Sequence, residues 1–336
     1  MWAARVRKKL AAFVRGVATL CGVMTIHQAH ELQAGSREVC LAIGVFDGVH
    51  LGHQQIIRQT IADARKHNGI AVVVTFDRHP NAIVAPDRVP PLIYSLPQKV
   101  RTIESLDTDA LLLLQFDQAF SQQTGEAFIR HLVRDLGTIQ SICVGADFVF
   151  GHQRSGNVAL LQKLGAEMNF TVHGIAAVAL DGQVVSSTRV REAIRAGDLD
   201  AASQMLGRTY SLAARIVQGD RLGRQLGFPT ANLDTPVFVL PPNRVYAARA
   251  TVGGQSHQAV VNLGYRPTLQ PATPQLRVEV HLLDFNEEVY GAEMEVNFAV
   301  RLRAEMKFAS VVALREQIGR DVAAARKIMG PSPDAV

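Results

Sequence analysis

Residues 44–53 of this sequence read G-V-F-D-G-V-H-L-G-H, and the first half of the chain is organised around them. The apolar run 39–43 precedes this stretch, and residues 53–62 after it carry apolar side chains at helical spacing. The pattern predicts a strand, a glycine-rich turn and a helix. Glycines let the backbone approach a ligand closely, and the first N–H groups of a helix have no partner inside it. A phosphate group fits such a corner.

The same stretch carries two imidazoles, His50 and His53, which can donate hydrogen bonds to a phosphoryl oxygen as charge builds on it. The alternative is a common glycine turn with two surface histidines. The stretch resembles the H-x-G-H motif of the nucleotidyltransferase superfamily. Its longer form is similar to G-x-F-D-G-V-H-x-G-H of the bacterial bifunctional riboflavin kinase/FAD synthetases. The resemblance implies that both histidines are catalytic and that the nucleotide is contacted by Gly44, Phe46, Asp47, Gly48 and Gly52.

Length and composition favour a globular protein of two domains, since the chain has 336 residues and 48% of them are hydrophobic. The net charge of +5 comes from the N-terminal stretch, because without its five basic residues the other 30 equal the 30 acidic residues. The overall charge balance therefore does not support a nucleic-acid-binding surface. The five residues are Arg5, Arg7, Lys8, Lys9 and Arg15.

Residues 1–23 are basic, apolar and free of acidic side chains, a composition typical of a signal peptide, a transit peptide or an amphipathic arm. Arg15 interrupts the apolar segment, and no stretch reaches the ~18 apolar residues of a membrane span. We interpret the stretch as a start-site extension or a disordered arm. Three distant cysteines, Cys21, Cys40 and Cys143, predict neither a disulfide framework nor a zinc site. We expect a cytoplasmic protein with no membrane partner.

Buried strands alternate with helices from residue 39 to about residue 145. The runs 70–76, 110–116 and 141–145 are apolar enough to lie inside a parallel sheet, and 96–103 and 128–136 have helical periodicity. The alternation predicts a doubly wound α/β sheet, which binds ligands at the carboxyl ends of its strands.

Three polar clusters follow these elements, at residues 75–80, 144–157 and 186–191. Taken alone, the third is an ordinary Ser/Thr N-cap with two solvated arginines. Together, the clusters predict one convergent site. They resemble the T-F-x-P-H-P, G-x-D-F-x-F-G and S-S-T-x-I-R segments of the FAD synthetase family. Arg78 replaces a proline of that family, and Val149 replaces a common arginine, which removes a possible phosphate or flavin contact. The resemblance implies ligand contacts from Asp147, Ser186, Ser187, Thr188 and Arg191.

The second half changes to short strands, which predict a small antiparallel β-barrel. Residues 207–210 read as the boundary. The expected domains are a basic extension over 1–35, an adenylyltransferase domain over 36–201 and a kinase domain over 202–330. The predicted strands are 211–218, 245–252, 259–263, 276–283 and 294–300, followed by a helix over 310–329.

The barrel domain begins with a glycine motif, G-D-R-L-G-R-Q-L-G-F-P-T-A-N-L over residues 219–233. Its glycines allow a loop to wrap phosphates, and the oxygens of Thr230 and Asn232 suit Mg²⁺. The alternative is a plain glycine hairpin. The segment G-F-P-T-A-N resembles the riboflavin kinase signature, with Leu222 replacing a common arginine. The resemblance implies nucleotide contacts from Gly219, Gly223, Arg224, Gly227, Phe228 and Pro229.

Three later segments also resemble riboflavin kinases. Asn262 begins N-L-G-Y-R-P-T, similar to N-I-G-x-R-P-T, and Arg303 and Glu305 match R-P-E-K-x-F with Ala304 in place of proline. These matches imply that Asn262, Arg303 and Glu305 contact ligand. Glu279 lies on an alternating strand, where a glutamate is usually only solvated. The resemblance implies that Glu279 is the general base, and a carboxylate suits removal of a proton from an attacking alcohol.

The leading prediction is a bifunctional enzyme that uses Mg²⁺ and ATP to convert riboflavin to FMN and FMN to FAD. One alternative is a kinase whose first domain only binds nucleotide. The other is an RNA-associated flavin-binding protein that uses the basic N-terminal arm. Riboflavin, FMN and ATP are the expected small-molecule partners, nucleic acid is not expected, and the oligomeric state is left open.

Overall fold

A computed structural model describes residues 23–219, 222–265 and 276–330 of the chain. Most of the predicted basic extension, residues 1–22, therefore lies outside the described residues, as do Asp220, Arg221 and the R-P-T of the N-L-G motif. The chain divides into two compact units. The first comprises Met1–Val45, His53–Val89 and Val100–Ala177, and the second comprises Phe46–Gly52, Pro90–Lys99 and Val178–Val336.

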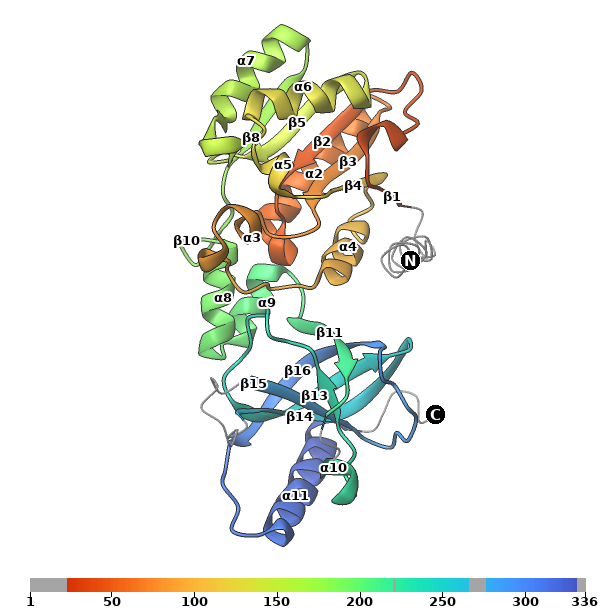
Figure 1. Ribbon diagram of the computed structural model, residues 1–336, viewed down its shortest axis with the longest axis vertical. Helices are drawn as coiled ribbons and strands as arrows, with labels where there is room; N and C mark the ends of the chain where they lie inside the picture. Colours follow the sequence, from red (N-terminus) through yellow and green to blue (C-terminus); the bar gives the residue numbers. More distant parts are fainter. Residues whose placement is uncertain (1–22, 220–221, 266–275, 331–336) are drawn as a thin grey trace, which may run out of the picture. The chain divides into compact units, whose positions relative to one another are not determined.

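The first unit is built on a parallel sheet of six strands in the order β1-β4-β3-β2-β5-β8, with helices flanking it (Figure 1). The predicted doubly wound sheet is confirmed. The strands are β1 (Met24–Ile26), β2 (Val39–Ile43), β3 (Ile70–Phe76), β4 (Ala110–Leu114), β5 (Ile139–Gly145) and β8 (Thr171–Ile175). The helices and 3-10 turns are η1 (Ala29–Glu31), α2 (Leu51–Lys66), α3 (Asn81–Val84), η3 (Pro86–Arg88), α4 (Leu96–Glu104), α5 (Gln118–Ser121), α6 (Gly125–Leu136) and α7 (Val158–Met168).

The sheet forms because its central strands have apolar side chains on both faces. Every residue of β2 and β3 is buried, and the two strands pair in parallel from Val39 opposite Ile70 to Ile43 opposite Val74. Such strands need helices on both sides, which α2 and α6 provide with their apolar faces. Thr124 caps the start of α6, and Gly137 ends it at a φ of 85°.

The strand order reverses beside β2. The chain passes from β2 to β3 and β4 on one side, and then returns to place β5 on the other side of β2. Ligands of open α/β sheets bind at such a reversal, outside the carboxyl ends of the strands. The loops that follow β2 and β5 are therefore the ones placed for a ligand.

Small elements complete the chain between the sheet and the barrel. The hairpin β6–β7 (Val149–Phe150 and Gly156–Asn157) surrounds the turn η4 (His152–Arg154). In the second unit, β9 (Ala179–Leu180) and β10 (Gln183–Val184) form a hairpin before α8 (Ser187–Ala196) and α9 (Leu199–Leu206). The turn η2 (Asp47–Val49) also belongs to this unit.

The second unit contains a closed antiparallel barrel of six strands in the order β11-β12-β15-β14-β13-β16. The barrel was predicted, but the structure extends β14 and β16 beyond the expected ranges and adds β12. The elements are β11 (Ser211–Val217), α10 (Leu222–Gln225), β12 (Ala231–Leu233), β13 (Arg244–Val252), β14 (Gln255–Tyr265), β15 (Leu276–Leu282), β16 (Glu293–Ala304) and α11 (Val311–Met329). Helix α11 packs on the outside of β13, β14 and β16 (Figure 1).

The core of the second unit is larger than the interior of the barrel. Alternate residues of the strands point inward, and this core also includes Ile93, Tyr94 and buried residues of α8 and α9. The barrel is therefore stabilised by the segment 90–99 as well as by its own strands.

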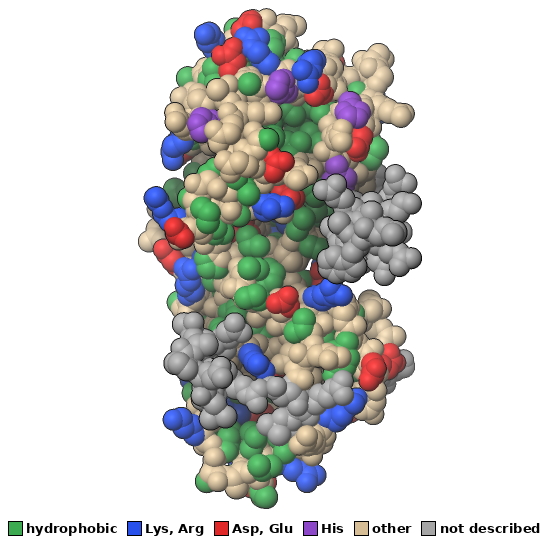
Figure 2. Space-filling view, viewed as in Figure 1, with side chains coloured by type: hydrophobic (Ala, Val, Ile, Leu, Met, Phe, Trp, Pro, Cys, Tyr) green, Lys and Arg blue, Asp and Glu red, His purple; other side chains and the backbone are tan. Residues whose placement is uncertain are grey.

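Acidic and basic side chains are mixed over the described part of the face shown in Figure 2, where no broad patch of one sign is visible. No helix among the described residues combines the length and the apolar character needed to cross a membrane.

Candidate functional sites

Two hydrogen bonds join the carboxyl ends of β2 and β3 in the first unit. The Gly44 amide donates to the Val74 carbonyl at 3.1 Å, and the Thr75 hydroxyl donates to the Val45 carbonyl at 3.1 Å. Both bonds hold the chain immediately after β2, where the glycine motif begins. The predicted ligand position at Gly44 therefore lies on a fixed backbone at the point where the strand order reverses.

The polar cluster after β3 is held by Asp77. Its carboxylate accepts from the Phe116 amide at 2.9 Å and from Arg78 at 2.8 Å. Arg78 is 49% exposed, so this ion pair contributes at most about 1 kcal/mol to stability. The arginine that replaces a proline of the resembling family is thus accommodated at the surface.

The cluster after β5 presents an exposed carboxylate beside aromatic rings. Asp147 is exposed in the turn that follows β5, and the rings of Phe148 and Phe150 stack with centroids 5.1 Å apart. The Phe150 ring also contacts the Phe128 ring of α6, with centroids 6.2 Å apart. These aromatic contacts fix the turn on the sheet. Val149 remains 37% exposed, and it brings no charge to this position.

The loop 46–52 belongs to the second unit, and it has an unusual backbone. Phe46, Gly48 and Val49 all have positive φ angles, of 52°, 75° and 42°. Positive φ is strained for a β-branched residue such as Val49. The loop is nonetheless buried from Phe46 to His50, so contacts with the rest of the unit must hold it.

Asp47 supplies several of these contacts. Its carboxylate accepts from the amides of Ile93 at 3.1 Å and Tyr94 at 3.4 Å, and it pairs with Arg191 at 2.6 Å. Arg191 also donates to the Pro91 carbonyl at 2.7 Å. Asp47 therefore joins the loop to the segment 90–99 and to α8.

The predicted cluster 186–191 lies against the same loop. The Ser186 hydroxyl caps α8 by accepting from the Arg189 amide at 3.2 Å, and the Ser187 hydroxyl donates to the Asp47 carbonyl at 3.1 Å. Thr188 is exposed, whereas Arg191 is buried. The structure thus brings Ser187 and Arg191 to Asp47 of the glycine motif, and Ser186 has the capping role of the alternative interpretation.

His50 lies in this loop directly before α2, and only 6% of its surface is exposed. Burial, followed by the nearby charges of Arg208 and Arg191, lowers the pKa of His50 to about 4. The imidazole is therefore neutral at pH 7. A side chain at Gly52 would approach the His50 ring to 3.2 Å, so the glycine leaves room for the imidazole. His53 lies in the first turn of α2.

The barrel carries a row of three polar side chains on neighbouring strands. Glu279 of β15 lies opposite Asn232 of β12 and opposite Asn262 of β14. Residues directly opposite one another in a sheet point to the same face, so the three side chains are neighbours. Their chain neighbours Val278 and Val280 are buried in the barrel, and the row therefore lies on the outer face. Within the described part of the chain, no hydrogen bond occupies the Glu279 carboxylate.

The glycine motif of the barrel ends at this row. Phe228 donates its amide to the Gly223 carbonyl at 2.8 Å, which closes the turn formed by α10 and Gly227. The Gly219 backbone lies against the Asn232 amide group, and the Gly223 backbone lies against Thr230. A hydrogen bond of 2.8 Å joins His281 Nδ1 to the Pro229 carbonyl. The motif is thus anchored to β15 two residues from Glu279.

The donor set beside Glu279 fits a magnesium ion that also binds phosphate. Thr230 and Asn232 flank the buried Ala231, so their side chains lie on the same side of the extended chain. Mg²⁺ prefers oxygen ligands and commonly takes one or two from the protein and the rest from phosphates and water. No cluster of three His, Cys, Asp or Glu side chains suited to a metal occurs among the described residues. The neutral side-chain oxygens of Thr230 and Asn232 therefore suit a Mg²⁺ ion that is bound mainly by the phosphates of a nucleotide.

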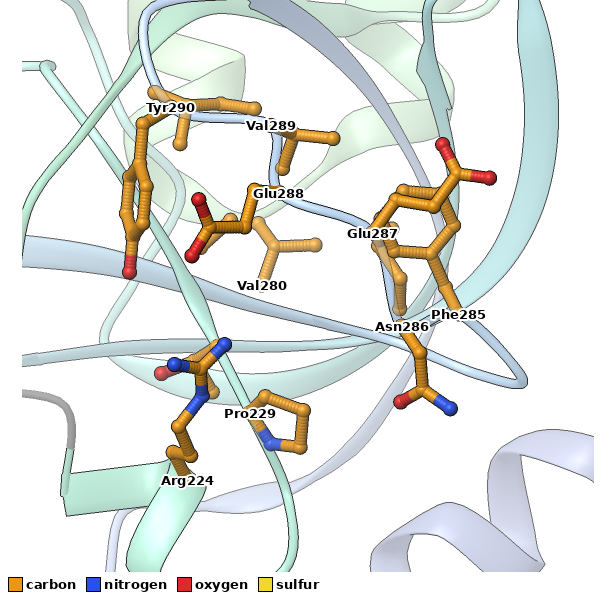
Figure 3. A pocket seen from close by; sticks show the side chains of 13 residues that line it. Arg224, Pro229, Val280, Phe285, Asn286, Glu287, Glu288, Val289 and Tyr290 are labelled. Atoms are coloured by element: carbon orange, nitrogen blue, oxygen red, sulfur yellow. The ribbon is translucent and has the colours of Figure 1, made fainter.

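A pocket of about 290 Å³ adjoins Thr230. Its apolar lining includes Val280, Leu282 and Val289. Arg224 and Glu288 reach into it from two sides (Figure 3). Thr230 also lines it, so the predicted metal ligand and the pocket are contiguous.

Arg303 and Glu305 are placed differently from each other. Arg303 donates to the buried carboxylate of Asp321 at 2.7 Å, which fixes α11 to β16. Glu305 lies over Gly264, because a Cβ atom at Gly264 would come within 2.5 Å of the Glu305 carboxylate. The same Cβ atom would lie close to the Asn262 side chain, so Glu305 and Asn262 are near each other. Glu305 therefore lies near Asn262 of the row, whereas the Arg303 guanidinium is engaged by Asp321.

Sequence analysis missed three residues that hold these sites, namely Arg208, His281 and Asp321. Arg208 donates to the loop 46–52 across more than 150 residues of chain, and no local pattern marks such a contact. His281 shares a strand face with Glu279, and a histidine on such a face gives no sequence signal of a contact with the Pro229 carbonyl. Asp321 is an acidic residue on the buried side of α11, and this position was the only sequence signal of its structural role.

The fold and the two sites define a transferase of two parts, each of which is built for a nucleotide. Residues 32–189 match the family model for FAD synthetase, and residues 206–329 match the model for riboflavin kinase. The chain belongs to the bifunctional riboflavin kinase/FMN adenylyltransferase family. Enzymes of this family use ATP as a substrate.

Relatives of that name match over almost the whole chain. The Pseudomonas fluorescens protein is 38% identical over 303 residues, which cover 90% of this chain and 97% of the relative. The Escherichia coli K12 protein is 36% identical and covers 91% and 97%. A crystal structure titled as a macrolide-efflux protein from Streptococcus pneumoniae shares the fold, with a TM-score of 0.74, 28% identity and coverage of 91% and 99%. The predicted family and the predicted two-part fold are confirmed.

Proposed function

We propose that this chain makes FMN from riboflavin and ATP at the barrel, and FAD from FMN and ATP with the motif of residues 44–53. The row formed by Asn232, Glu279 and Asn262 carries the first part of this proposal, because it sets a carboxylate that has no hydrogen bond among the described residues beside oxygen ligands for Mg²⁺. Matches to both family models favour two activities over a kinase with an inactive first domain. They do not favour the RNA-associated alternative.

In the kinase reaction, Glu279 accepts the proton of the riboflavin 5′-hydroxyl. The hydroxyl oxygen then bonds to the γ-phosphorus of ATP, the bond from this phosphorus to the β-phosphate oxygen breaks, and ADP leaves. A carboxylate in hydrogen-bond reach contributes about 10² to 10⁴ in rate to such a transfer. Asn262 lies beside Glu279 and Glu305 lies near Asn262, and both orient the flavin.

Thr230 and Asn232 hold the Mg²⁺ that accompanies ATP, and the ion offsets charge on the phosphates. The described backbone of the glycine motif, at Gly219 and over residues 222–227, borders the phosphates. Since Thr230 lies at the edge of the pocket, the adenine base of the same ATP extends into the apolar part of the pocket. Arg224 reaches into this pocket and is placed to contact the nucleotide.

In the adenylyl transfer, a phosphate oxygen of FMN bonds to the α-phosphorus of ATP, and pyrophosphate leaves. His50 and His53 donate hydrogen bonds to the phosphate oxygens as negative charge builds on the leaving group. Because His50 is neutral at pH 7, it acts as a hydrogen-bond donor without bringing a full charge. The start of α2 contributes backbone N–H groups to the same phosphates, whereas the Gly44 N–H is engaged by the Val74 carbonyl.

We also propose that both reactions take place in the cytoplasm. One experiment tests the proposed function as a whole. Purified protein is incubated with riboflavin, ATP and Mg²⁺, and the flavins are separated by chromatography over time. The expected result is that FMN appears first and FAD follows, and that a chelator stops both. FMN that accumulates without FAD would limit the enzyme to the kinase reaction.

A further inference from the structure

Arg208 makes contacts that the two reactions described above do not explain. It lies between α9 and β11, in the segment that enters the barrel. Its guanidinium donates to the carbonyls of Gly48 at 2.5 Å and Val49 at 3.1 Å. These are the two carbonyls that immediately precede His50 in the chain. One side chain at the entry to the barrel therefore binds the backbone of the adenylyltransferase motif.

The guanidinium is itself held in one orientation. Its Nε donates to the Tyr94 hydroxyl at 3.1 Å, and its central carbon lies 5.0 Å from the centre of the Tyr94 ring. One of its terminal nitrogens also donates to the Leu206 carbonyl at 2.9 Å. A planar fork fixed in this way binds two carbonyls with a geometry that a lysine ammonium does not reproduce.

The loop needs such a fixed partner. Val49 has a φ of 42°, a conformation that a β-branched residue holds only when its surroundings enforce it. Asp47, the residue before Gly48, is fixed by Arg191 and by the backbone amides of segment 90–99. Arg208 binds the carbonyls of the two residues after Asp47, so without it the backbone next to His50 loses two of its enforcing contacts.

We propose that Arg208 is a positioning residue for adenylyl transfer, which fixes the Gly48 and Val49 carbonyls and so holds the His50 imidazole in place for the ATP phosphates. The inference rests on the proposed role of His50. Arg208 touches the loop and no substrate, and it acts only through that loop.

Arg208 also acts on His50 through its charge. Its positive charge is the second cause, after burial, that lowers the pKa of His50 to about 4, and Arg191 is the third. The charged groups that act on His50 are thus Arg208 before β11 and Arg191 of α8, and Arg191 is itself paired with Asp47 of η2. Removing the Arg208 charge raises the pKa of His50, so the imidazole becomes protonated at a higher pH.

The test measures both activities in the full-length Arg208→Gln variant. We expect FAD formation from supplied FMN to fall about 10²-fold, because a displacement of about 1 Å costs a rate of that order. FMN formation should stay within about threefold of the unchanged protein. The acid limb of the pH profile of FAD formation should move to higher pH. Arg208→Lys should restore part of the rate, because it keeps the charge and loses the fork. Arg195→Gln, on the exposed side of α8, is the matched control.

Two results would overturn the inference. An equal loss of both activities would make Arg208 a general support of the fold, and a normal rate of FAD formation would leave it without a role. If Arg208→Gln does not fold, Tyr94→Phe serves instead, since it removes only the hydroxyl that orients the guanidinium. It should then lower FAD formation alone, and a normal rate or an equal loss of both activities would again overturn the inference. A normal rate of FAD formation in His50→Ala would contradict the proposed role of His50. This variant therefore separates a failure of the proposed function from a failure of the inference about Arg208.

Discussion

Asp47 and Arg191 form a buried ion pair of 2.6 Å, in which each side chain is less than a tenth exposed. The pair joins the glycine motif to α8. Replacing Arg191 with methionine leaves the Asp47 carboxylate buried without its cation, which typically costs about 3–5 kcal/mol of unfolding free energy. Urea unfolding of Arg191→Met should show this loss, whereas Arg195→Met at an exposed position of the same helix should change little. The double variant Asp47→Asn/Arg191→Met should regain much of the stability. An unchanged unfolding midpoint for Arg191→Met would mean that the pair contributes nothing.

His50 should make stability depend on pH. Its pKa is about 4 in the folded protein and about 6.5 when unfolded, because burial and two arginines disfavour the charged form. The unfolded chain therefore binds more protons between these values, so stability is full above pH 6.5 and is lost as pH falls towards 4. The loss is about 3 kcal/mol. It is measured as the difference in unfolding free energy between the unchanged protein and His50→Gln across this range. A pH-independent difference would contradict the prediction.

His53→Ala tests the adenylyltransferase site from the helix side. Losing one preorganised donor typically lowers the rate about 10²-fold or more, because charge on the leaving phosphates is no longer stabilised. FAD formation should therefore be nearly abolished while FMN formation is spared. Both rates are read from the same chromatographic assay. Equal loss of the two activities would identify His53 as a structural residue.

Glu279→Gln tests the general base of the kinase. The substitution keeps size and polarity but cannot accept the proton, so FMN formation should fall by about 10² to 10⁴. Flavin and nucleotide binding should remain, and supplied FMN should still be converted to FAD. Glu126→Gln, on the exposed surface of α6, is the control. Near-normal FMN synthesis would remove Glu279 from the mechanism, and loss of flavin binding would assign it to substrate positioning.

A chain that starts at Ala202 tests how far the kinase part stands alone. It should phosphorylate riboflavin without making FAD, as the sequence predicts. The structure adds that Ile93 and Tyr94 belong to the same core as the barrel, and this chain lacks them. Each buried side chain of this size contributes about 1.5–3 kcal/mol. We therefore expect an active fragment that melts at a lower temperature than the kinase part of the full chain. An insoluble or inactive fragment would show that residue 202 is the wrong starting point.

Sequence patterns predicted the elements that have a strong local signal. The apolar runs of β2 and β3 predicted buried strands, and the helix expected over 310–329 is α11. β8 was missed because Thr171–Ile175 includes a histidine and a glycine and lies at the sheet edge, where one side needs no apolar partner. β12 was missed because its three residues lie inside the glycine motif.

The candidate site residues show the same division. The sequence named both histidines and Glu279 through motifs that are contiguous in the chain. It also placed Arg191 among ligand contacts, because an arginine at a helix start looks available to phosphate. The structure shows its guanidinium bound to Asp47 and Pro91. That difference depends on a partner 144 residues away, which no local pattern contains.

The sequence by itself determined the family, the two-part fold and the residue types of both reactions, because backbone propensities and short motifs act over neighbouring residues. The tertiary structure alone decided which side chains are left for chemistry and which hold the backbone. Glu279 stands between two asparagines because strand register sets side chains opposite one another. Arg208 reaches Gly48 because folding brings residues 160 positions apart into hydrogen-bond distance. Such contacts depend on the positions of whole elements, and those positions are fixed only when the core has formed.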